Sequence, residues 1–146
     1  MIAATLQALT EEAAAGLGGQ ATLRISHFPF KVGRECRLPG TERPWPRAIA
    51  GFVERRLRRT PQLNDLYVIE WPSAEGFHLS REHFAIERVG SRFVVVDRGS
   101  ASGTRVGETR LSVDSTAQQA EVHDGDVIVA GSQHSPYRYR FDLSAG

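Results

Sequence analysis

The stretch that decides the fold is Leu79-Ser80-Arg81-Glu82-His83-Phe84-Ala85-Ile86, a polar block that runs directly into an apolar strand-like segment. A glycine–arginine pair lies upstream in Val32-Gly33-Arg34-Glu35, and a loop-like segment follows downstream at Asp97-Arg98-Gly99-Ser100-Ala101-Ser102-Gly103-Thr104. Strand-like segments separate these three blocks. Their order predicts that hydroxyl groups, guanidinium groups and loop amides meet in a small all-β protein. Such groups suit the oxygens of a phosphate monoester.

Length and composition indicate one globular domain. The chain has 146 residues, of which 40% are hydrophobic and 24% are charged, as in ordinary globular proteins. The single cysteine, Cys36, excludes an internal disulfide framework and a cysteine-cluster metal site, and it suits a reducing compartment. No apolar run is long enough to span a membrane, and the N-terminus lacks the pattern of a signal peptide. We therefore expect a cytoplasmic protein without a membrane span.

Basic charge is concentrated in one segment. Only Lys31 among the 18 basic residues is a lysine, and residues 37–60 hold seven arginines against Glu42 and Glu54. The net charge of the whole chain is nevertheless only +1. Arginine has a planar donor fork that matches carboxylate or phosphate, so this segment could meet an acidic partner. A compositional bias towards arginine explains the same observation.

This basic segment belongs to an insert that we expect at residues 38–64, where the alternating pattern of short strands and turns is interrupted. Apolar residues at helical spacing between Pro46 and Pro61 predict a short helix at about residues 46–60. Two interpretations of its four terminal arginines remain open. These residues are Arg55, Arg56, Arg58 and Arg59. They could border the recognition face and favour acidic or multiply phosphorylated ligands, or they could form a solvated helix face.

Residues 1–20 are expected to form a helical or partly ordered leader. Leu6, Ala13 and Leu17 permit an amphipathic helix before a glycine-rich turn. Thr10, which is followed by two glutamates, could instead cap a shorter helix.

The remaining chain alternates between short strand-like segments and turns. Strands are expected where apolar and polar residues alternate or where apolar residues cluster between turn residues: 21–26, 28–32, 65–71, 84–89, 93–97, 104–106, 109–113, 120–123, 127–129 and 137–141. Many short strands at close spacing indicate an all-β sandwich.

This ordered set of motifs resembles the forkhead-associated (FHA) domain family over about residues 21–143. The resemblance rests on Gly33-Arg34, on the Ser-Arg-Glu-His block with Ile86, on residues 100–104 and on Gly125-Asp126-Val127-Ile128. It implies a sandwich of about eleven strands whose loops at one end bind phosphothreonine in a partner protein.

The resemblance also implies roles for individual residues. The phosphate contacts of the family correspond to Arg34, Ser80 and Arg81. Gly33 and His83 correspond to structural residues at the site. The expected peptide-binding loop contains a turn that shapes the site and comprises Ser102, Gly103 and Thr104.

The chain departs from the family pattern in this loop. Ala101 and Ser102 stand where many members have a hydroxyl residue followed by asparagine. Ala101 has no hydroxyl, and Ser102 offers fewer hydrogen-bonding groups than asparagine. The hydrogen bonds to the peptide backbone are therefore expected to be weaker or to involve other groups. His78 and Ala101 are candidates for contact with ligand side chains.

Other site chemistries are disfavoured. Ser80, with His83 and Asp97, could suggest a hydrolase triad, but Ser80 precedes a strand and does not lie on a strand–turn–helix elbow. The histidines lack metal-ligand spacing, and no nucleic-acid motif accompanies the basic segment. We expect no catalytic residue, no metal, no cofactor and no nucleic-acid partner.

Two functions remain open. The first is a phosphothreonine-dependent adaptor in Ser/Thr kinase signalling, whose threonine-phosphorylated partner would be a kinase or its substrate. The second is a non-catalytic structural or assembly module of the same fold with weak or no phosphopeptide binding. The oligomeric state is open in both.

Overall fold

The structure, a computed structural model, describes residues 2–35, 64–71 and 76–145. The predicted helix at about 46–60 lies outside these residues. The elements, in chain order, are β1 (Ile2–Ala8), α1 (Glu11–Gly16), β2 (Thr22–Ile25), β3 (Phe30–Arg34), β4 (Leu66–Val68), β5 (Phe84–Val89), β6 (Arg92–Asp97), β7 (Thr104–Val106), β8 (Thr109–Leu111), β9 (Gln119–Val122), β10 (Val127–Ala130) and β11 (Arg138–Ala145).

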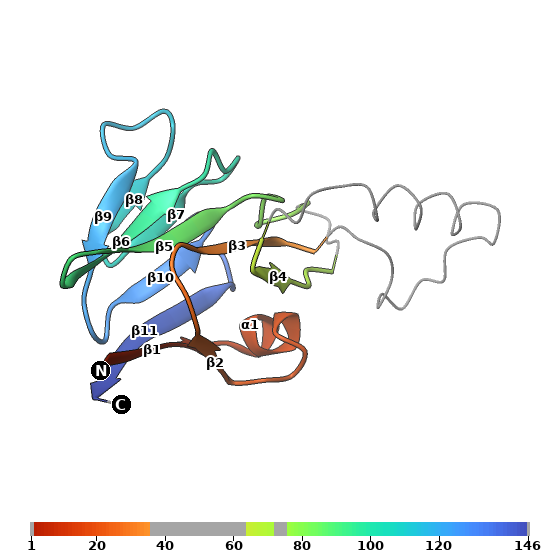
Figure 1. The fold of residues 1–146 in the computed structure, drawn as a ribbon. Helices are drawn as coiled ribbons and strands as arrows, with labels where there is room; N and C mark the ends of the chain where they lie inside the picture. The colour runs from red at the N-terminus through yellow and green to blue at the C-terminus, as the bar shows by residue number, and fades with distance from the viewer. Residues whose placement is uncertain (1, 36–63, 72–75, 146) are drawn as a thin grey trace, which may run out of the picture.

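Two β-sheets pack against each other (Figure 1). The six-stranded sheet has the order β2-β1-β11-β10-β7-β8, and the five-stranded sheet has the order β4-β3-β5-β6-β9. Neighbouring strands are antiparallel except β3 and β4, which are parallel. The predicted all-β sandwich is confirmed, and the described residues form eleven strands.

The β5–β6 hairpin shows how the strand pattern is encoded. Its two-residue turn begins at Gly90, whose φ of +64° suits a tight hairpin turn because glycine has no Cβ. The resulting register places Ile86 opposite Val95. Both side chains are fully buried.

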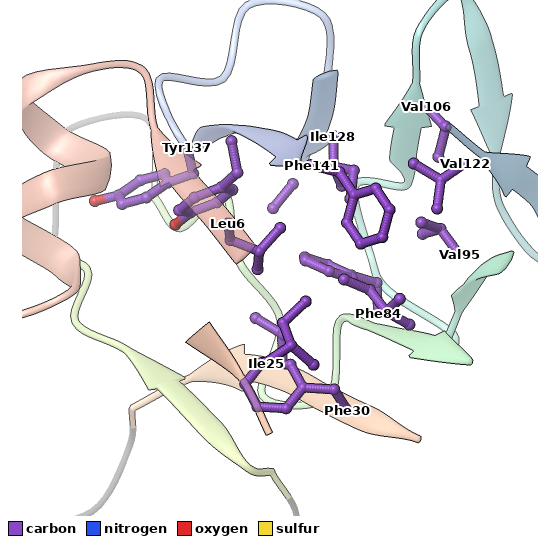
Figure 2. Close-up of a cluster of buried hydrophobic side chains, with 14 of the residues drawn as sticks. Leu6, Ile25, Phe30, Phe84, Val95, Val106, Val122, Ile128, Tyr137 and Phe141 are labelled. Carbon is purple, nitrogen blue, oxygen red and sulfur yellow. The ribbon is translucent and has the colours of Figure 1, made fainter. Parts of the chain in front are cut away.

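A hydrophobic core fills the space between the sheets (Figure 2). Phe84 and Val95 come from the five-stranded sheet, and Leu6 and Ile128 come from the six-stranded sheet. All four are at most 1% exposed. Burial of each large apolar side chain contributes about 1.5–3 kcal/mol, so the core holds the two sheets, and the loops between their strands, in one arrangement.

The prediction of a helical or partly ordered leader is wrong for residues 2–8. They form β1, which pairs with β2 on one side and β11 on the other. Leu6 lies opposite Phe141 and is 1% exposed. The helical spacing of Leu6, Ala13 and Leu17 spans two different elements, and pairing with distant strands decided the local structure. The sandwich therefore includes residues before residue 21.

The alternative of a short helix capped by Thr10 is confirmed. The Thr10 hydroxyl oxygen accepts a hydrogen bond from the Ala13 amide at 3.0 Å and donates to the Pro136 carbonyl. Glu11 and Glu12 lie in the first turn, where negative charge stabilises the helix by interacting with the helix dipole. Within the described ranges, no helix has the length and apolar character needed to cross a bilayer.

Candidate functional site

Three segments meet at the candidate site: the end of β3, the turn before β5 and the loop between β6 and β7. The Arg34 amide donates to the Ser80 carbonyl at 2.8 Å, and the His83 amide donates to the Val32 carbonyl at 3.0 Å. The Ala101 amide donates to the Ser80 hydroxyl oxygen at 2.9 Å. The structure thus brings together the three sequence blocks through hydrogen bonds between residues that are at least 21 positions apart.

Gly33 permits the close approach of β3 to the turn before β5. A Cβ atom at this position would lie 1.9 Å from the Arg81 carbonyl oxygen and 2.6 Å from the Asn64 side-chain nitrogen. Both distances are far below van der Waals contact. Gly33 therefore acts through its missing side chain, by letting the backbones of Arg34 and Arg81 lie side by side.

His83 ties the turn before β5 to the β6–β7 loop. Its side chain is fully buried, and its Nδ1 atom accepts a hydrogen bond from the Ser80 amide at 2.9 Å. Because Nδ1 is an acceptor, the proton of the neutral ring lies on Nε2. Nε2 then donates to the Gly103 carbonyl at 2.8 Å. Both ring nitrogens contact main-chain groups, so His83 is not paired with a serine hydroxyl as in a hydrolase triad.

Burial lowers the pKa of His83 below its ordinary value of 6.5. Protonation would also place an N–H group against the Ser80 amide, which is itself a donor. The unfolded chain binds the proton more readily than the folded one, so stability rises with pH below about 6.5. We expect the free energy of unfolding to fall as the pH drops from 7.5 to 5.5, as measured by urea denaturation.

The control for this pH dependence is His83→Gln, whose amide can accept and donate hydrogen bonds but does not titrate. Its free energy of unfolding at pH 7.5 should be lower than that of the wild type, and its loss between pH 7.5 and 5.5 should be smaller. An equal loss in both proteins would show that other groups cause the pH dependence.

Asp97 organises the loop between β6 and β7. Its Oδ2 atom accepts hydrogen bonds from the Gly99 and Ser100 amides, each at 3.1 Å. Its Oδ1 atom accepts from the hydroxyls of Ser100 and Thr104. Sequence reasoning considered Asp97 only as a triad member. Its spacing to Gly99 and Ser100 is typical of an aspartate that caps a turn, and this signal could have identified its role.

Two loop residues, Gly103 and Thr104, use their polar groups inside the fold. Thr104 is fully buried, and its hydroxyl donates to Asp97 at 2.8 Å. Gly103 has a φ of +85°, and its carbonyl accepts from His83 and from the Gly131 amide. These two residues shape the loop from inside the fold, because their polar groups are already used. Ala101 is exposed and Ser102 is half-buried at the loop surface.

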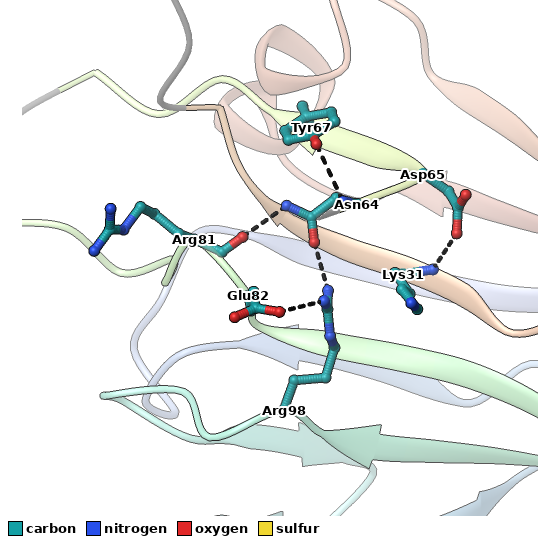
Figure 3. Close-up of polar contacts among 7 residues, drawn as sticks. All are labelled: Lys31, Asn64, Asp65, Tyr67, Arg81, Glu82 and Arg98. Carbon is teal, nitrogen blue, oxygen red and sulfur yellow. Dashed lines mark hydrogen bonds and ion pairs between the residues drawn. The ribbon is translucent and has the colours of Figure 1, made fainter. Parts of the chain in front are cut away.

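The Ser80 hydroxyl and two guanidinium groups remain as donors at this site. Ser80 Oγ accepts from the Ala101 amide, which leaves its own O–H group to donate. The Arg81 side chain is exposed and extends away from the polar contacts around it (Figure 3). The Arg34 guanidinium carbon lies 3.7 Å from the centre of the Phe77 ring. Across the described residues, no carboxylate forms an ion pair with Arg34 or Arg81.

Asn64 is a buried residue of the site that sequence reasoning missed (Figure 3). It is 2% exposed, and its amide nitrogen donates to the Arg81 carbonyl at 2.7 Å. Its amide oxygen accepts from Arg98, which also forms an ion pair with Glu82 at 2.9 Å. Asn64 therefore fixes the backbone of Arg81. No local pattern marks it, since its side-chain partners, Arg81 and Arg98, are distant in sequence.

His78 lies beside a different feature. Its ring centre is 6.1 Å from that of Tyr137, and burial raises the pKa of Tyr137 to about 12. Both residues line a cavity of about 360 Å³ that does not include Arg34, Ser80 or Arg81. Its lining consists of Glu11, Glu12, Ala15, Glu70, Trp71, His78, Pro136 and Tyr137. Contact between His78 and a ligand bound at Arg34 stays a prediction.

No group of three metal-ligating side chains is close enough to hold a metal ion in the part of the chain that the structure describes. The polar side-chain groups that remain at the site are donors, namely two guanidinium groups and one hydroxyl. Such a set can bind an anion with several acceptor oxygens.

Comparisons with known proteins identify the family and agree with the two-sheet fold. The family model for the FHA domain matches residues 59–131, half of the chain. The FHA domain of an Arabidopsis thaliana hypothetical protein superposes with a TM-score of 0.60 at 18% identity, covering 100% of this chain and 89% of that one. Mycobacterium tuberculosis Rv1747 FHA-1 gives a TM-score of 0.56 at 16% identity, with coverages of 99% and 98%.

Mycobacterium tuberculosis EmbR, solved in complex with a low affinity phosphopeptide, gives a TM-score of 0.54 at 20% identity, covering 99% of this chain and 25% of EmbR. No curated protein matches the chain in a sequence search. These identities show a shared fold, and the family model rests on the segment that carries Ser80, Arg81, His83 and the β6–β7 loop. The chain belongs to the FHA domain family.

Proposed function

We propose that this domain is a phosphothreonine-dependent protein-binding module, an adaptor in cytoplasmic Ser/Thr kinase signalling with no catalytic role of its own. The observation that carries the proposal is the set of free donors around Ser80. Its hydroxyl oxygen is oriented by the Ala101 amide at 2.9 Å, and Arg34 and Arg81 lack carboxylate partners among the described residues.

The chemistry of a phosphothreonine matches this set. The phosphate carries about −1.5 to −2 charges at neutral pH and has three strong acceptor oxygens. We propose that Arg34 and Arg81 supply charge-assisted hydrogen bonds, each worth about 1.5–3 kcal/mol. The Ser80 hydroxyl would take a further oxygen, and Ser102 would contact the peptide. The bound protein would be a Ser/Thr kinase or a substrate of one.

Family membership supports this proposal, and so does one fold relative. EmbR shares the fold and has been solved with a phosphopeptide. In the present chain, Gly33, His83 and Asp97 hold the three segments in place without using the side-chain donors of Ser80, Arg34 and Arg81. We further propose that residues 2–145 form one domain, with residues 38–64 as an insert.

The experiment that tests the proposal compares matched peptides. A degenerate phosphothreonine library would be screened first, and the selected sequence would then be made with phosphothreonine, phosphoserine and unmodified threonine. We expect binding of the phosphothreonine form and at least tenfold weaker binding of the unmodified form by calorimetry. Ser80→Ala should weaken phosphopeptide binding about fivefold to tenfold, which corresponds to one hydrogen bond.

A second candidate function is an assembly module of the same fold. Ala101 favours it, because this exposed loop position offers no side-chain hydroxyl to a ligand. Equal binding of the phosphorylated and unmodified peptides, or binding of neither, would support this alternative and contradict the adaptor.

A further inference from the structure

Phe77 is an exposed aromatic residue beside the candidate phosphate site. Its side chain is 46% exposed, and it precedes Ser80 by three residues. The guanidinium carbon of Arg34 lies 3.7 Å from the centre of its ring. This distance is well within the range of a cation–π contact. Neither the glycine–arginine pair nor the serine–arginine block contains Phe77, so the sequence motifs do not indicate this contact.

The ring contact coincides with an unusual hydrogen-bonding state of Arg34. The Nε atom of Arg34 is buried and has no hydrogen-bond partner among the described residues. Arginine side chains that are held in place are usually fixed by carboxylates or carbonyl oxygens. Here the Arg34 guanidinium carbon lies over the Phe77 ring, and no described carboxylate pairs with the guanidinium group.

This arrangement has a consequence for anion binding. A carboxylate that oriented Arg34 would occupy its N–H groups and neutralise its charge, and a phosphate would have to displace it. An aromatic face contacts the guanidinium plane and leaves the N–H groups at its edge free. Phe77 can thus restrict the rotamers of Arg34 without competing for the ligand, which reduces the conformational cost of binding.

We propose that Phe77 is the positioning residue for the phosphate contact of Arg34. This inference rests on the proposed function, since it assumes that Arg34 binds the phosphate. Phe77 acts through Arg34 in this role and makes no phosphate contact itself, because its side chain has no hydrogen-bond donor.

Two substitutions separate the aromatic ring from simple apolar bulk. Phe77→Leu keeps an apolar side chain and removes the π face, whereas Phe77→Tyr keeps the ring. With the phosphothreonine peptide selected from the library, we expect Phe77→Leu to bind about fivefold more weakly, equivalent to about 1 kcal/mol. Phe77→Tyr should stay within about twofold of the wild type.

The matched control is Trp71→Leu. Trp71 is 42% exposed, close to the value for Phe77, but it lines the separate cavity beside His78. The Trp71→Leu variant should bind the phosphothreonine peptide within about twofold of the wild-type affinity. A fivefold loss here as well would mean that removal of any exposed ring in this region weakens binding, and it would overturn the specific role of Phe77.

A double-mutant cycle distinguishes positioning from direct ligand contact. The single variant Arg34→Ala and the double variant Arg34→Ala/Phe77→Leu would be titrated with the same peptide. NMR is used because it can measure weak binding. If Phe77 acts through Arg34, the second substitution should change affinity by less than about twofold in this background. A persistent fivefold loss would show that Phe77 contacts the peptide and would overturn the proposal.

A ligand-free readout reports the contact itself. The Arg34 Nε–H resonance should show a ring-current shift in the wild type and in Phe77→Tyr, and it should lose that shift in Phe77→Leu. An unshifted wild-type resonance would contradict the contact.

The peptide data distinguish failure of the proposed function from failure of the proposed role of Phe77. A wild type that binds no phosphopeptide would overturn the proposed function and this role with it. A wild type that binds while Phe77→Leu binds equally well would overturn the role of Phe77 alone.

Discussion

Replacing Arg34 with alanine should abolish most phosphate-dependent binding and leave the fold intact. The guanidinium would supply at least one charge-assisted hydrogen bond and the attraction of a full charge for a phosphate dianion. A loss of about 1.5–3 kcal/mol corresponds to affinity at least tenfold weaker. Calorimetry with the selected phosphothreonine peptide and its unmodified form measures this change.

The stability of Arg34→Ala should change little. The Arg34 side chain makes no hydrogen bond to the described residues, and its amide, which donates to Ser80, is retained in alanine. We expect the free energy of unfolding in urea to stay within about 1 kcal/mol of the wild type. Loss of binding can then be assigned to the site.

The matched control for Arg34→Ala is Arg88→Ala. Arg88 also lies over an aromatic ring, 5.7 Å from the centre of Phe93, but it belongs to the opposite end of β5 from His83. Its removal should leave phosphopeptide affinity within about twofold of the wild type. Equal losses for both variants would indicate a general effect of positive charge, and unchanged binding by Arg34→Ala would contradict the proposed phosphate contact.

Gly33→Ala should cause the largest loss of stability among the substitutions considered. The new Cβ would lie 1.9 Å from the Arg81 carbonyl oxygen. That carbonyl cannot move freely because Asn64 donates to it and the neighbouring Ser80 carbonyl accepts from Arg34. Overpacking typically costs about 1–3 kcal/mol, and a clash with backbone should reach or exceed the upper end. Urea denaturation measures the loss.

A second glycine provides the comparison for Gly33→Ala. Gly107 has a φ of +58° and no heavy atom within 4 Å of an added Cβ. Gly107→Ala therefore introduces backbone strain of about 1–2 kcal/mol without a clash. A loss in Gly33→Ala no greater than in Gly107→Ala would show that β3 and the turn before β5 separate at little cost.

Much of the fold was accessible from local patterns. The β5–β6 hairpin follows from alternating apolar residues on both sides of Gly90, and the two-sheet sandwich follows from repeated strand and turn signals. Residues 2–8 were misassigned because Leu6 fits a helical repeat as well as a strand. Pairing of β1 with β11 joins the two ends of the sequence, and no local pattern records such a contact.

The candidate site, too, was only partly predictable from the sequence. Its motifs identified Arg34, Ser80, Arg81 and His83 as a group, and the structure brings the segments that carry them together. The motif for the β6–β7 loop did not reveal that Thr104 lies inside the fold. Its burial depends on Asp97, whose carboxylate holds several loop groups at once.

The sequence by itself determined the family, most of the strands along the chain and the residues whose chemistry suits a phosphate, because these depend on residue types and spacing. Only the tertiary structure decided which polar groups remain free. Thr104 and His83 use their side chains within the fold, whereas Ser80 keeps a donor. Phe77 and Asn64 became part of the site for the same reason. Hydrogen bonds and ring contacts between distant segments form only when the sheets pack, and no periodic pattern in the sequence indicates them.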